Sequence, residues 1–103
     1  MTVLKNGRYR AVHAQTATDI EDAQALRARC FGLHRDADAF DSMCTHILIR
    51  RVSDNALVCC FRMMPLSGAE ISRSYSAQYY ALEALAAYEC NLVEMGRLCV
   101  DAW

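Results

Sequence analysis

Three arginines occupy positions where a charged side chain is unexpected, on the apolar face of a helix or within a strand. Arg27 falls on the apolar face of an expected helix, Arg62 interrupts an apolar strand, and Arg97 follows Glu94 by three residues. The planar guanidinium fork suits two-point contact with a carboxylate or a phosphate. An unpaired buried charge is costly. These arginines therefore predict either ion pairs inside the fold or a cleft for a substrate or partner, and both interpretations stay open.

A charged connector from Arg35 to Asp41 contains two further candidate site residues, Asp38 and Asp41. Their carboxylates could bind a metal ion, but the connector lacks the glycine-punctuated spacing of a calcium loop. A solvated loop is the favoured interpretation, and we expect no metal. Glu94 and Arg97 likewise admit two interpretations, a structural salt bridge or a functional pair.

The elements that would position these residues begin with a strand over 8–14 and a helix over about 19–31. Thr18-x-x-Glu21 is a capping-box pattern for the helix start, and Gly32 is a candidate for the left-handed residue after its end. Helical spacing puts Arg27 on one face with Ile20, Ala23 and Phe31.

A hairpin follows, with strands over 44–52 and 56–64 joined by the turn residues 53–55. The second strand is apolar on both faces, which is typical of a central covered strand. Pro65 should end it, because proline has no N–H to donate. We then expect a loop over 65–75, a helix over 77–88 capped by Ser76, and a last strand over 92–100. A bulge at Gly96 would bring Glu94 and Arg97 to one face of that strand.

The composition fits one globular domain: the chain has 103 residues, 54% of them hydrophobic, and a net charge of −1. That near balance of charge argues against nucleic acid as a partner. No apolar run is long enough to span a membrane and no signal core is visible. The six cysteines show no C-x-x-C spacing, so we expect reduced thiols and a cytoplasmic protein.

Four segments together resemble one group of acyltransferases. They are Leu-Arg27-Ala-Arg-Cys-Phe31, Asp38-Ala-Phe-Asp41, Phe61-Arg62 and Glu94-Met-Gly-Arg97. In this order they resemble the acyl-homoserine lactone (autoinducer) synthases, whose fold is the GNAT acyltransferase fold. Tyr75-Ser-Ala-Gln-Tyr-Tyr80 and Glu94-Met-Gly-Arg-Leu-Cys-Val100 are more similar to the related ornithine N-acyltransferases of ornithine lipid synthesis. The absence of a tryptophan just after the first helix also favours the ornithine branch.

The resemblance implies an α/β (α+β) fold, the N-terminal half of a GNAT domain with a mixed, mostly antiparallel sheet. It implies transfer of a fatty acyl group from acyl carrier protein, or from acyl-CoA, to the α-amine of an amino acid such as ornithine. No permanent cofactor is expected. Glu94 would accept the amine's proton, and backbone N–H groups at the bulge would hold the oxyanion. Arg97 would orient Glu94 or bind the substrate carboxylate. Arg27, Phe31 and Arg62 would line the cleft, with Asp38 and Asp41 pairing the arginines.

GNAT enzymes bind the donor's pantetheine and phosphate just after the fourth strand, and this sequence ends there. We therefore expect residues 1–103 to be the N-terminal part of one domain, inactive alone, with its last strand covered by further chain, a second polypeptide or a dimer mate. Peripheral contact with the inner face of the membrane stays open. The alternatives are an autoinducer synthase, a generic acetyl-CoA-dependent enzyme, and a non-catalytic acyl- or partner-binding module.

Overall fold

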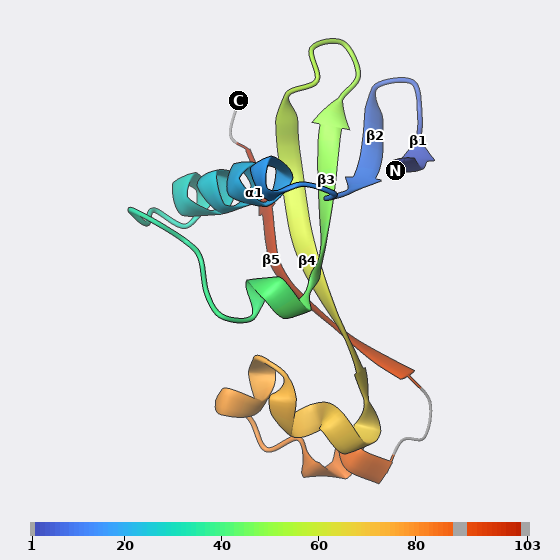
Figure 1. Ribbon diagram of the computed structural model, residues 1–103, viewed down its shortest axis with the longest axis vertical. Helices are drawn as coiled ribbons and strands as arrows, with labels where there is room; N and C mark the ends of the chain where they lie inside the picture. The colour runs from blue at the N-terminus through green and yellow to red at the C-terminus, as the bar shows by residue number, and fades with distance from the viewer. Residues whose placement is uncertain (1, 88–90, 102–103) are drawn as a thin grey trace.

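The structure, a computed structural model, describes residues 2–87 and 91–101, and it has a five-stranded antiparallel sheet with one α-helix on one face. Tyr88, Cys90 and Trp103 lie outside the described residues. The strands follow one another across the sheet in chain order (Figure 1). Their bounds are Thr2–Lys5 (β1), Tyr9–His13 (β2), Thr45–Arg51 (β3), Leu57–Ser67 (β4) and Asn91–Val100 (β5). The α+β fold class is confirmed, and β1 is a strand that the sequence did not predict.

The helix α1 spans Ala17–Cys30 and begins two residues before the predicted start. The predicted capping box at Thr18 and Glu21 is wrong, because Thr16 is the N-cap and its hydroxyl accepts from the Asp19 backbone N–H at 3.1 Å. The Asp19 carboxylate in turn accepts from the Gln15 N–H at 2.9 Å. A similar reciprocal arrangement thus operates two residues earlier, where the chain is still extended and the first amides need acceptors.

Gly32 ends the helix as predicted. Its φ of +67° is left-handed, and the Leu33 N–H donates to the Ala28 carbonyl at 2.8 Å across it. Behind the helix, Ala23 and Leu26 pack on Cys60 and Cys99, which come from neighbouring strands. This small apolar core fixes α1 across β4 and β5.

The hairpin of β3 and β4 forms as predicted, but β4 does not end at Pro65. It continues to Ser67, and Pro65 pairs with Val93 of β5. Since β3 begins at Thr45, opposite Met63, β4 has only β5 beside it at Pro65. A proline is tolerated where one side of a strand has no partner, because no neighbouring strand then needs the N–H that proline lacks.

The predicted helix over 77–88 is wrong for the residues described. This region holds short 3-10 segments instead: η2 over Gly68–Arg73, η3 over Ser76–Gln78 and η4 over Glu83–Ala87. Tyr79 and Tyr80 are 64% and 70% exposed, so no continuous apolar face is buried here. A helix of this length is marginal without such packing. These segments lie at the opposite end of β4 and β5 from α1 (Figure 1).

The bulge in β5 is present, one residue after Gly96. Cys60 pairs with Cys99 and Arg62 pairs with Gly96, so Arg97 and Leu98 together face Phe61 alone. Arg97 has a left-handed φ of +53°. The extra residue shifts the alternation of side chains. Glu94 and Arg97 are both partly buried on the helix side, whereas Leu98 is 65% exposed.

Candidate functional site

Arg27 is 1% exposed and lies between two carboxylates of the connector. Its Nε donates to Asp36 at 2.9 Å and its Nη1 donates to Asp41 at 2.7 Å. The helix supplies the arginine and the connector wraps back beneath it to supply both acids. Arg27 is therefore paired inside the fold, which is what a buried guanidinium requires.

Arg62 approaches the same connector from β4 and is 4% exposed. Its Nη1 donates to Asp38 at 2.7 Å and to Asp41 at 2.8 Å, and its Nη2 donates to Asp38 at 3.1 Å. Asp41 is thereby shared between the helix and the sheet. The Gln24 amide donates to its other oxygen at 2.9 Å, so both oxygens of this carboxylate are bonded.

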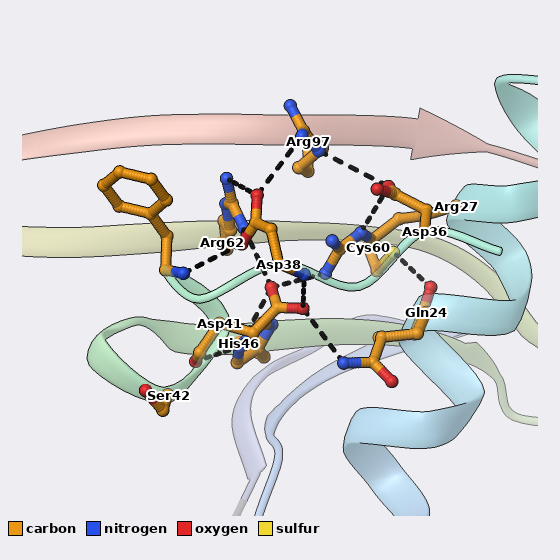
Figure 2. A network of polar contacts seen from close by, with 12 residues as sticks. Gln24, Arg27, Asp36, Asp38, Asp41, Ser42, His46, Cys60, Arg62 and Arg97 are labelled. Carbon is orange, nitrogen blue, oxygen red and sulfur yellow. Dashed lines mark hydrogen bonds and ion pairs between the residues drawn. The ribbon is translucent and has the colours of Figure 1, made fainter. Parts of the chain in front are cut away.

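Arg97 completes the group from the bulge of β5. Its Nε lies 3.4 Å from the Asp36 carboxylate, and its Nη2 donates to Asp38 at 3.3 Å. Figure 2 shows Asp36, Asp38 and Asp41 lying between the three arginines. We call these six residues the charged cluster: Arg27, Arg62, Arg97, Asp36, Asp38 and Asp41.

The pairing shifts the pKa values of the cluster. Burial alone would raise the pKa of Asp41, but the hydrogen bonds from Arg27, Gln24 and Arg62 outweigh it and lower that pKa to about 2. The pKa of Asp38 is also lowered, because the bonds from Arg62 outweigh burial. Burial would lower the pKa of Arg62, yet its two carboxylate partners raise it. Asp38, Asp41 and Arg62 therefore stay charged near neutral pH.

Glu94 lies outside the cluster and is held by the backbone. Its two oxygens accept from the N–H groups of Tyr75 and Ser76, each at 2.8 Å. Burial would raise the pKa of Glu94, but these hydrogen bonds lower it. The carboxylate therefore fastens the 74–78 segment to β5 and remains an anion.

A pocket of about 240 Å³ opens at the bulge. We call it the bulge pocket, and it is lined in part by Cys44, Arg62, Tyr75, Ser76, Glu94 and Arg97. The bulge brings the predicted pair, Glu94 and Arg97, to one cavity. The pocket offers a fixed carboxylate, two guanidinium groups and hydroxyl groups, a set that suits orientation of a polar substrate and stabilisation of developing charge.

Two of the residues predicted to line a cleft, Arg27 and Phe31, do not line the bulge pocket, and Arg27 is instead enclosed in the charged cluster. Phe31 caps the end of α1 and is 45% exposed, and it does not line the bulge pocket. Three residues that were assigned no role in the site from the sequence also take part. Asp36 bridges two arginines, His46 lies 2.8 Å from the Asp41 carbonyl oxygen, and Tyr75 lines the pocket. Asp36 lies in the same connector as Asp38, and His46 lies on the same face of β3 as buried Leu48. These positions could have drawn attention to both residues, but they do not predict which residues each one contacts.

No group of His, Cys, Asp and Glu side chains in the described ranges 2–87 and 91–101 is arranged to hold a metal ion. Over those same ranges, no helix is long and apolar enough to cross a membrane.

Comparison with protein families gives one match. The model of the family described as "Acetyltransferase (GNAT) domain" matches residues 21–102, which is most of the chain. The match includes most of α1, the connector and β3 to β5, and with them the charged cluster and the bulge pocket. Searches of curated proteins and of solved structures returned no match. The chain belongs to the acetyltransferase (GNAT) domain family.

Proposed function

We propose that the protein transfers a fatty acyl group from acyl carrier protein to the α-amine of an amino acid, with ornithine as the favoured acceptor, as in lyso-ornithine lipid synthesis. Membership of the GNAT family supports acyl transfer to an amine. The motifs around Tyr75 and Glu94, which are similar to those of ornithine N-acyltransferases, support the finer assignment. The bulge pocket, which joins Glu94 to Arg97, carries the proposal.

In this proposal the amine attacks the thioester carbonyl beside the bulge. The backbone N–H groups at a bulge are not all used by the ladder, so they can hold the oxyanion that forms. The nitrogen becomes far more acidic once it has attacked. A carboxylate with a lowered pKa, such as Glu94, can then accept its proton directly or through water. The C–S bond then breaks, and the carrier sulfur takes up that proton, from Glu94 or through water, and leaves as a thiol.

The charged cluster acts as the frame of the pocket. Arg62 and Arg97 are tied to Asp38, so the pocket wall keeps its shape while a substrate binds. Arg97 is 24% exposed and is the cluster arginine best placed to contact a substrate carboxylate. Arg27 is fully buried, so in this proposal it holds the cluster together and does not contact the substrate.

We propose further that another polypeptide segment pairs with β5, whether continuing chain, a second polypeptide or a dimer mate. In the described sheet β5 is an edge strand, and Val93, Met95, Leu98 and Val100 are each at least 56% exposed along it. A long apolar edge of this kind invites a covering strand.

The test is an acyl-transfer assay of the full-length gene product with ornithine and a long-chain acyl carrier protein thioester, read by mass spectrometry. Formation of the acyl amide with release of free carrier thiol is the expected result. An enzyme that uses acetyl-CoA but not the carrier thioester would replace this proposal with the second candidate, a generic acetyltransferase, which the description of the matched family favours. Binding of acyl carrier without turnover would indicate a binding module.

A further inference from the structure

Tyr75 lies where the charged cluster meets Glu94. Its ring faces two guanidinium groups, with the central carbon of Arg97 at 4.8 Å from the ring centroid and that of Arg62 at 5.5 Å. The Phe40 ring meets it edge-on at 5.4 Å. An arginine over a tyrosine face within about 6 Å is held by the charge distribution of the ring. One aromatic side chain thus touches the arginine of β4 and the arginine of the bulge.

The backbone of Tyr75 takes part as well. Its N–H donates to one oxygen of Glu94 at 2.8 Å, and the next N–H, from Ser76, donates to the other. The Ser74 hydroxyl accepts from the Ala77 N–H at 3.1 Å, which closes the turn around Tyr75. The position of the ring and the position of the Glu94 carboxylate are therefore set by the same short turn.

We propose that Tyr75 is a positioning residue of the bulge pocket: its ring holds the Arg97 and Arg62 guanidinium groups in place while its backbone holds Glu94. The expected effect of Tyr75 on catalysis depends on the proposed acyl transfer. The contact between the ring and the arginines does not depend on it.

The electrostatics of the phenol agree with this arrangement. A hydrogen bond with Arg97, followed by one with Tyr79, lowers the pKa of Tyr75. The Tyr79 ring lies 5.5 Å from that of Tyr75 and is 64% exposed, so it stands on the solvent side.

Two substitutions separate the ring from the hydroxyl. Tyr75→Phe keeps the ring over both arginines, whereas Tyr75→Leu removes it. Tyr80→Leu is the matched control, because Tyr80 belongs to the same segment and is 70% exposed. In the acyl-transfer assay we expect Tyr75→Leu to lower kcat by about tenfold to a hundredfold with KM little changed, as loss of orientation does. Tyr75→Phe should restore most of kcat, and the control should match the wild type.

A second readout does not depend on turnover. The Arg97 Nε–H signal, assigned by its loss in Arg97→Lys, should be displaced in the NMR spectrum by the ring of Tyr75. It should keep that shift in Tyr80→Leu, keep the part of it that comes from the ring in Tyr75→Phe, and lose it in Tyr75→Leu. An Arg97 signal that is the same in Tyr75→Leu as in the wild type would overturn the proposal, as would a Tyr75→Leu enzyme with normal kcat. A wild type with the expected NMR shifts but no acyl transfer would instead overturn the proposed function and leave the ring contact standing.

Discussion

Arg27 and Arg29 lie two residues apart on α1 and meet opposite environments. Arg27 is 1% exposed and bonds to two buried carboxylates, whereas the Arg29 side chain is 58% exposed and lies 3.5 Å from Asp101. Removing one partner of a buried ion pair leaves the others uncompensated, at a cost of about 3–5 kcal/mol. We therefore expect Arg27→Met to lower the free energy of unfolding in urea by that amount.

The matched substitution Arg29→Met should cost less than about 1 kcal/mol, because an exposed pair contributes little. Equal losses for the two substitutions would mean that Arg27 is not enclosed by the connector.

The pKa of Asp41 predicts a loss of stability in acid. This pKa is about 2 in the folded protein and 3.8 ordinarily, so the folded state favours the ionised carboxylate. The resulting stability, on the order of 2 kcal/mol, is present above pH 3.8 and is lost as the pH falls to about 2. Unfolding measured from pH 5 to pH 2 should show this decline.

In Asp41→Asn, which is already less stable than the wild type at pH 5, the same decline should be smaller. A decline identical to that of the wild type would assign the acid sensitivity to other carboxylates.

From the sequence, the arginines were singled out and Asp38 and Asp41 were named as possible partners, but no role was assigned to Asp36 or Tyr75. Arg27 and Arg62 stood out because they interrupt apolar patterns, and that signal is local. Asp36 and Tyr75 sit in polar or aromatic loop segments where their types are ordinary. Their importance arises from the path of the connector and of the 74–78 turn, which no spacing encodes. The shared face of Glu94 and Arg97 could be predicted because glycine in a strand is a local sign of a bulge.

At the scale of elements, the start of α1 offers a direct comparison. Thr16 accepts the Asp19 N–H, whereas Thr18 lies inside the helix and is exposed. We expect Thr16→Ala to lower the free energy of unfolding by about 1 kcal/mol, the usual cost of losing an N-cap. Thr18→Ala should be neutral or slightly stabilising, because alanine is the better helix former. Thermal unfolding of the two variants checks this, and a larger loss for Thr18→Ala would restore the predicted capping box.

Elements with strong local signals were predicted, and elements that depend on neighbours were not. The β3–β4 hairpin follows from apolar runs on both sides of a three-residue turn. β4 can continue through Pro65 because β3 does not extend that far. This depends on how the strands pair in the sheet, which the local sequence around Pro65 does not show. The 76–87 segment has helical composition, but Tyr79 and Tyr80 face solvent. The segment therefore lacks a buried apolar face, and propensity alone does not hold a helix of this length.

At the scale of the molecule, the sheet is covered unequally. The helix packs on one face of β4 and β5, while Val93, Met95, Leu98 and Val100 are exposed on the other side of β5. If a further segment pairs with β5, its outward N–H groups should exchange with solvent faster in residues 1–103 alone than in the full-length gene product. Hydrogen exchange read residue by residue measures this. Equal and slow exchange in both would mean that the edge needs no partner.

Acyl transfer by the full-length gene product and its Glu94→Gln variant tests the central claim most directly. The measurement is the rate of amide formation from ornithine and the carrier thioester, with Glu21→Gln, an exposed carboxylate on α1, as control. We predict that Glu94→Gln loses about a hundredfold or more in kcat, while Glu21→Gln keeps wild-type activity and both variants remain folded. Full activity in Glu94→Gln would contradict the claim that the bulge pocket is where acyl transfer occurs.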